Sequence, residues 1–279
     1  MSFPLALNQY LVRLDLTVPD SLSLDFVCEL QRRHVAEFSF NNLAVVLGDD
    51  ISLDLEDVSE KIVTRGLGAY CFEHNKLTFE LLKALGYDVQ LKLARVLNNN
   101  LERAAGRTHR VTLLTLNNEM YLIDTGFGGN GPLSPLSLST QQEQQSGFEH
   151  YRMLPLEGGE WDVQIVKDGD YFTLYRFDFA HYSEADCAVG HFYSHRHPNA
   201  VFVNNLMVTN KELDKTRSLL NSTFNIKTES GEQSRKVDSP RVLQSILAEH
   251  FQIKLELVVA EHLFERFVQS ELDDSQTRS

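Results

Sequence analysis

Cys71 is the residue whose surroundings in the sequence best suit nucleophilic chemistry. A cysteine attacks as its thiolate, and a helix N-terminus or a nearby imidazole favours that charged form. Four apolar residues follow at helical spacing, namely Leu77, Leu81, Ala84 and Leu85, and Gly86 is suited to end the helix. The sequence therefore predicts Cys71 at or near a helix N-terminus. Cys28, within an apolar helical stripe, is typical of a core residue.

A histidine and an aspartate can supply the matching base and orienting acid. The dipeptide 117–118, Asn-Asn, separates two alternating runs and predicts a two-residue β-turn. In that register Asp124 lies opposite Val111, and His109 projects to the same face, so His109 and Asp124 become diagonal neighbours about 7–8 Å apart at the backbone. A loop with an odd number of residues would place them on opposite faces. Cys71, His109 and Asp124 are thus a candidate triad, with His109 as the base and Asp124 fixing its tautomer.

The elements that must position this triad change in character along the chain. Helical periodicity predicts helices over 24–38 and 54–63, as well as after Cys71. From Tyr87 the period becomes two, and Asp168-Gly169 indicates a second hairpin. The remaining predictions are a strand over 201–209, a late helix capped by Ser239-Pro240, and loops over 128–146 and 227–240.

Composition excludes several classes of protein. The chain has 279 residues, of which 42% are apolar and 23% charged, which is typical of a folded globular protein. A formal charge of −13 repels polyanions, and no basic patch is evident, so we expect no nucleic-acid partner. Neither a membrane span nor a secretory leader is recognisable, which favours the cytoplasm. Three scattered cysteines, Cys28, Cys71 and Cys187, are expected to be free thiols.

Three stretches around the triad resemble the arylamine N-acetyltransferase family: 71-CFEHN-75, 108-THRVTLL-114 and 122-LIDTGFGG-129. The resemblance extends to 34-HVAEFSFNNL-43, 85-LGYDVQLKLARV-96 and 191-HFYSHRHPNAVF-202. It can be followed over most of residues 8 to 210. By this resemblance Cys71 is the nucleophile, His109 the base and Asp124 the orienting acid. The 38 residues from Cys71 to His109 separately disfavour a papain-type protease, whose histidine lies far downstream.

The resemblance also implies a fold and an activity. The fold is α+β: an N-terminal helical bundle over 1–87 carrying the cysteine, a central antiparallel β-barrel over 88–209 carrying the histidine and aspartate, and a C-terminal α/β lid over 210–279. The activity is ping-pong transfer of an acetyl group from acetyl-CoA to an arylamine or hydrazine through an acetyl-Cys71 intermediate. Neither a metal nor a membrane partner is implied, and the protein would be a monomer or homodimer.

Further residues are assigned more loosely by the matching segments. Four phenylalanines could line an aromatic acceptor pocket: Phe40, Phe72, Phe127 and Phe202. Gly126 and Gly128 belong to a glycine-rich run that could approach CoA, although no P-loop lysine follows. Three histidines, His191, His195 and His197, have spacings that could suit a metal, but no cysteine or carboxylate set accompanies them, so no metal is predicted.

The sequence departs from the family pattern ahead of the cysteine. Leu67 and Ala69 stand where the family has arginine and the second glycine, while Ser39 and Asn41 stand where it has proline and glutamate. An arginine and a carboxylate are absent together, as expected if they form a buried pair in other members, because one charge left alone is costly. This hypothesis requires Leu67 and Asn41 to be neighbours. Arg65 is an alternative substitute for the missing arginine.

Three other functions remain open. An amide synthase or acyltransferase of the same fold would use a longer or carrier-bound acyl group. A thiol hydrolase would replace the amine by water. A non-enzymatic binding module would keep the fold without the chemistry, and the altered residues Leu67 and Asn41 are the features that would favour it.

Overall fold

The N-terminal part of the computed structural model, which describes residues 3–269 and 271, is helical. Its elements are α1 (Leu5–Arg13), α2 (Leu24–Glu37), α3 (Leu43–Leu47), α4 (Leu55–Ser59), a π-helical turn (Glu60–Thr64) and α5 (Cys71–Ala84). The predicted helices are confirmed, although the one over 54–63 divides into α4 and the π-helical turn. Ser23 caps α2 by accepting a hydrogen bond from the Phe26 N–H.

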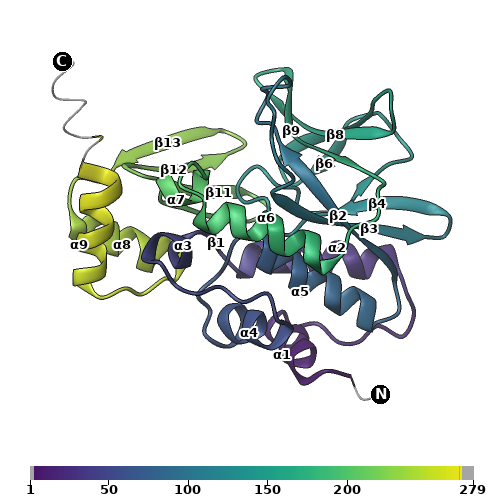
Figure 1. Cartoon of the computed structure of the whole chain (residues 1–279), viewed down its shortest axis with the longest axis horizontal. Helices are drawn as coiled ribbons and strands as arrows, with labels where there is room; N and C mark the ends of the chain where they lie inside the picture. Colours follow the sequence, from purple (N-terminus) through teal and green to yellow (C-terminus); the bar gives the residue numbers. More distant parts are fainter. Residues whose placement is uncertain (1–2, 270, 272–279) are drawn as a thin grey trace.

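An antiparallel sheet of eight strands forms the centre of the molecule, curled into a barrel-like shape above α5 (Figure 1). Its strand order is β5-β4-β3-β2-β9-β8-β7-β6. The strands are β2 (Asp88–Val96), β3 (His109–Leu116), β4 (Glu119–Ile123), β5 (Leu136–Ser137), β6 (Gln144–Ser146), β7 (Glu149–Pro155), β8 (Glu160–Lys167) and β9 (Asp170–Asp178). The Gln144 side-chain amide bridges the two edge strands by bonding to both N–H and C=O of Ser137. One side chain thus takes the place of backbone pairing where the barrel nearly closes.

The β3–β4 hairpin has the register that the sequence predicts. Leu116 pairs with Glu119 and Thr112 with Ile123. Asn117 and Asn118 have φ of 53° and 64°, the left-handed pair that a two-residue type I′ turn requires. Asp168-Gly169 likewise turns β8 into β9.

A second sheet of five strands combines one strand from the N-terminal part with four strands from the C-terminal part. Its order is β1-β10-β11-β12-β13, from β1 (Phe40–Asn41), β10 (Met207–Lys211), β11 (Lys215–Leu220), β12 (Thr223–Thr228) and β13 (Gly231–Lys236). The helices α8 (Pro240–Phe251) and α9 (Leu257–Phe264) share its apolar core. Along the chain, α6 (Glu184–Arg196) and α7 (Val201–Asn204) follow the last strand of the first sheet and precede β10 of the second. Because β1 pairs with β10, the N-terminal segment before Cys71 is hydrogen-bonded to the C-terminal sheet.

Three predictions of local structure are wrong. The strand expected over 201–209 is α7 followed by β10. The loop expected over 227–240 contains β13, whose six residues are all exposed and therefore show no apolar alternation. The loop over 128–146 includes the short strands β5 and β6. The division into three parts at 87 and 209 stays a prediction, and β10 crosses its second boundary.

No helix in the part of the chain described by the structure has the length and apolar character needed to cross a membrane.

A chain of buried polar groups crosses the core of the helical part. His34 Nε2 and His74 Nδ1 are 2.7 Å apart, Tyr10 bonds to the other side of His34, and His74 Nε2 reaches Ser39 O. Both imidazoles are buried. Burial lowers the pKa of His34 well below its usual value, and lowers that of His74 to about 4.

We therefore predict acid-sensitive stability. Below about pH 6.5 the unfolded chain binds protons at these two histidines, whereas the folded chain does not. Their contribution to the free energy of unfolding is therefore fully present above that pH and is lost as the pH drops toward 4. Each histidine contributes a slope of up to about 1.4 kcal/mol per pH unit. Urea unfolding between pH 7.5 and 4.5 measures this slope. His74→Gln, which keeps hydrogen-bonding groups but does not titrate, should flatten it; an equal slope in both proteins would contradict the prediction.

Candidate active site

Cys71 is the first residue of α5, as the sequence predicts. Its side chain is buried, and Sγ lies 3.7 Å from Thr108 O. The backbone N–H groups of Phe72 and Arg110 also face the sulfur and favour its charged form. The thiol therefore lies against the backbone on both sides of His109.

His109 and Asp124 form a direct hydrogen bond. His109 Nε2 is 2.7 Å from Asp124 Oδ2, and both side chains are buried. With Nε2 engaged by the carboxylate, Nδ1 is the ring nitrogen left to take a proton from a thiol. The predicted face and pairing of these two residues are thus confirmed in geometry.

The Asp124 carboxylate accepts four hydrogen bonds. Besides His109, Tyr175 donates to Oδ2 at 2.8 Å, while Asn75 Nδ2 and the Gly126 N–H each reach Oδ1 at 2.9 Å. Burial alone would raise the pKa of Asp124, but the interactions with His109, Asn75 and Gly126 outweigh burial and hold it below its ordinary value. Asp124 is therefore ionised at neutral pH.

Asn75 and Tyr175 are site residues that the sequence reasoning did not assign. Asn75 follows Cys71 by four residues, so both lie on one face of α5, and this spacing is a signal that could have found it. Its amide also bonds to Arg110 O and to the Thr125 N–H, which ties α5 to β3 and to the end of β4. Tyr175 lies on β9 and has no local signal, because its approach to Asp124 depends on long-range strand order.

Gly126 allows the hairpin and the helix to approach closely. A Cβ at this position would lie 2.7 Å from Asn75 Nδ2 and 2.9 Å from Cys71 Cα, so any side chain would push the two apart. The predicted contact of Gly126 and Gly128 with CoA stays a prediction. The Gly126 N–H is already used by Asp124.

The four phenylalanines separate into two groups. Phe40 and Phe127 line a small cavity of about 10 Å³, together with Asp124, and the Phe127 ring is 5.1 Å from that of His109. Phe202 contacts Phe40 at 5.9 Å between ring centroids but does not line that cavity. Phe72 is completely buried and packs against Tyr70 and His191.

The altered residues ahead of Cys71 are neighbours. Asn41 Nδ2 donates to Leu67 O at 2.9 Å, so the proximity that a lost ion pair requires is present. A neutral amide thus meets a backbone carbonyl here, and no charge is left alone. Arg65 is exposed, which does not favour it as a replacement for the missing arginine.

The three histidines of the third segment lie on or just after a helix, not on a loop or strand. His191 lies on α6 and bonds to the Tyr70 hydroxyl and to Ile51 O, and His195 stacks on it at 4.1 Å. Within residues 3–269 and 271, no group of three or more His, Cys, Asp or Glu side chains is arranged to hold a metal ion.

The pKa of the Cys71 thiol is raised, whereas a helix N-terminus alone would lower it. Although Cys71 begins a helix, burial and then the Asp124 charge raise its pKa above the ordinary value, against the smaller effect of the Phe72 and Arg110 N–H groups. The sulfur therefore needs an adjacent base to become a nucleophile at neutral pH.

This arrangement predicts how Cys71 reacts with iodoacetamide. In His109→Gln the rate of Cys71 alkylation should rise about tenfold per pH unit through pH 9 without a plateau, because the raised thiol pKa lies above that range. The wild-type protein should react faster at pH 7, since His109 can accept the proton. Peptide mapping by mass spectrometry distinguishes Cys71 from Cys28 and Cys187. A plateau near pH 7 in His109→Gln would contradict the prediction.

Comparison with known proteins identifies the family of this chain. Residues 23–259 match the family model described as N-acetyltransferase. The arylamine N-acetyltransferase of Escherichia coli K12 is 30% identical over 247 residues, covering 88% of both chains. The Mycobacterium marinum arylamine N-acetyltransferase, solved in complex with CoA, superposes with a TM-score of 0.88 at 28% identity, covering 94% of this chain and 99% of that one.

The Salmonella typhimurium arylamine N-acetyltransferase structure gives the same TM-score of 0.88, at 25% identity, over 95% of this chain and all of that one. The match thus includes the helical part, the barrel-like sheet and the C-terminal sheet. This chain belongs to the arylamine N-acetyltransferase family.

Proposed function

We propose that this protein transfers an acetyl group from acetyl-CoA to the nitrogen of an arylamine or arylhydrazine by a ping-pong mechanism, with Cys71 as nucleophile. The observation that carries the proposal is the buried His109–Asp124 hydrogen bond beside the Cys71 thiol, in a member of this family. Acetyl-CoA is the acyl donor, and the protein works in the cytoplasm, as a monomer or homodimer, on foreign arylamines.

In the first half-reaction Cys71 Sγ attacks the thioester carbonyl while His109 Nδ1 takes the thiol proton. Asp124 holds the ring and stabilises the positive charge that it gains. The tetrahedral intermediate then breaks its bond to the CoA sulfur, which leaves with the proton from His109. The backbone N–H groups of Phe72 and Arg110, which favour the charged form of the sulfur, are candidates to stabilise the oxyanion.

In the second half-reaction the acceptor nitrogen attacks the acetyl carbon, and His109 takes a proton from the nitrogen. Cleavage of the bond to Cys71 releases the amide, and the proton returns to the sulfur. Dividing one transfer into two steps lets the same base serve both.

Intact-mass spectrometry tests the proposal. Acetyl-CoA should add one acetyl group to the protein, peptide mapping should place it on Cys71, and an aromatic hydrazine should remove it with formation of the hydrazide. Cys71→Ala should gain nothing. Labelling by a longer acyl-CoA but not by acetyl-CoA would favour the amide synthase, and loss of the acetyl group to water alone would favour the hydrolase. An unlabelled protein that releases no CoA would refute the proposal.

A further inference from the structure

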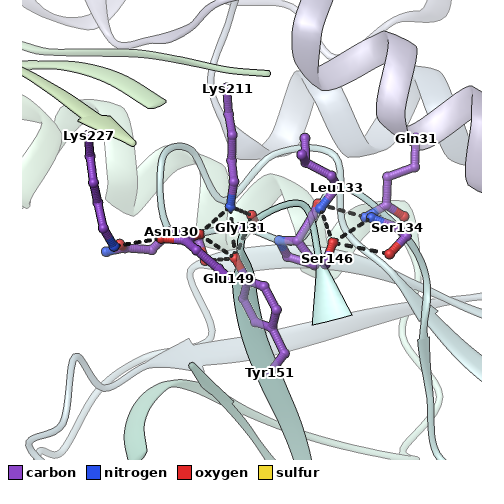
Figure 2. A network of polar contacts seen from close by, with 11 residues as sticks. Gln31, Asn130, Gly131, Leu133, Ser134, Ser146, Glu149, Tyr151, Lys211 and Lys227 are labelled. Atoms are coloured by element: carbon purple, nitrogen blue, oxygen red, sulfur yellow. Dashed lines mark hydrogen bonds and ion pairs between the residues drawn. The ribbon is translucent and has the colours of Figure 1, made fainter. Parts of the chain in front are cut away.

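A buried lysine joins the two sheets beside the candidate active site. Lys211, on β10, donates from Nζ to Glu149 Oε2 and to Gly131 O, each at 2.5 Å, and to the Tyr151 hydroxyl at 2.8 Å (Figure 2). Its side chain is 1% exposed and that of Glu149 is 4% exposed. We call Lys211, Glu149 and Tyr151 the Lys211 clasp.

The clasp holds a turn of the chain, residues 128–134, that has no regular structure. The Tyr151 hydroxyl lies 3.0 Å from Asn130 O and 2.9 Å from Gly131 O, in addition to its bond from Lys211. The turn is fixed further along as well, because Gln31 donates to Pro132 O at 2.9 Å.

Ser146 completes the attachment of the turn. Its Oγ accepts from the Leu133 N–H at 2.7 Å and from the Ser134 N–H at 3.1 Å. The backbone polar groups of residues 130 to 134 in Figure 2 are thus met by side chains from α2, β6, β7 and β10. A segment held at so many points is rigid, although it has no regular structure of its own.

The same turn forms part of the wall of the small cavity, which Lys211 also lines. Gly128, Gly131 and Pro132 line it together with Phe38 and Phe40, and it reaches Asp124 and Phe127. The Gly131 N–H bonds to Gly128 O at 2.8 Å, which closes the turn. The cavity is therefore bounded partly by the backbone of this turn and partly by aromatic side chains.

The Lys211 ammonium group has no hydrogen-bond donor left for a substrate. An ammonium group has three protons, and all three meet protein acceptors. Lys227 gives Glu149 a second cationic partner at 2.8 Å. Burial raises the pKa of Glu149, but the attraction and hydrogen bonds of the two lysines outweigh it and keep the carboxyl ionised.

A buried ion pair is often no more stabilising than apolar residues of similar volume. What it does provide is a defined geometry, because each hydrogen bond specifies a direction. Here the hydrogen bond from Lys211 fixes the orientation of the Gly131 carbonyl group, and Gly131 lines the cavity.

We propose that Lys211 is a positioning residue, whose clasp fixes the turn over residues 128–134 and so sets the shape of the site for the acceptor. The claim about the acceptor rests on the proposed function, whereas the claim that Lys211 fixes the turn does not. Acetylation of Cys71 should depend on the clasp much less than acceptor binding does, because α5, β3, β4 and β9 hold the thiol, His109 and Asp124 without it.

The test compares Lys211→Met with the matched control Lys227→Met. Both remove an amine that bonds to Glu149, but only Lys211 also bonds to the turn. Lys211→Met alone leaves the buried Glu149 carboxylate without its main partner, so the double variant Lys211→Met with Glu149→Gln removes that charge as well. Tyr151→Phe keeps the ion pair and loses only the hydroxyl, and so provides a milder variant if the others fail to fold.

Two measurements are made on each protein. Hydrogen–deuterium exchange reports on the Gly131, Leu133 and Ser134 amides without any substrate. Intact-mass kinetics follow Cys71 acetylation by acetyl-CoA, and then its discharge by aromatic hydrazines of increasing size.

We expect about 10- to 100-fold loss of protection at the turn in Lys211→Met, as a charged hydrogen bond is lost, with α5 amides unchanged. Tyr151→Phe should lose less, and Lys227→Met should match the wild type. Acetylation should stay within about threefold, while KM for a small hydrazine rises about tenfold and the preference for small over large hydrazines weakens.

Unchanged protection at the turn in Lys211→Met would overturn the proposal, and so would an equal slowing of both half-reactions. A wild-type protein that is never acetylated would refute the proposed function instead. In that case the exchange data still decide whether Lys211 fixes the turn.

Discussion

The burial of one carboxylate is the constraint on which the rest of this site depends. Asp124 is 1% exposed, and an ion in such a place must be surrounded by donors or lose its charge. Its four donors come from β3, β9, α5 and the backbone just past β4. These elements must meet at one point, and their meeting also places the Cys71 thiol against the backbone next to His109. The same requirement that stabilises the charge therefore assembles the chemistry.

Local sequence was enough to predict the parts of this site that depend on period and turn type. The Asn117-Asn118 turn determines register, and register determines that His109 and Asp124 share a face. Helical spacing after Cys71 likewise predicted α5 and its beginning. The family resemblance then joined two elements whose mutual packing no local pattern contains.

Contacts between distant strands were not predictable in this way. Tyr175 reaches Asp124 only because β9 pairs with β2 in the folded sheet. Lys211, Glu149 and Tyr151 lie outside the strands that the sequence predicted, and only the packing of β10 against β7 brings them into a buried cluster. The fully exposed β13 was missed because solvent on both faces leaves no apolar alternation to detect. The raised thiol pKa was also unexpected, since helix position can be inferred from sequence but depth of burial cannot.

The central claim is that buried Asp124 orients His109 so that it can deprotonate Cys71. Single-turnover acetylation of Cys71 in Asp124→Asn tests it most directly, with Tyr175→Phe as the matched control that removes one donor but keeps the carboxylate. The account predicts a fall on the order of 10²- to 10⁴-fold in Asp124→Asn and less than about tenfold in Tyr175→Phe, with both variants folded. Acetylation of Asp124→Asn at close to the wild-type rate would contradict it.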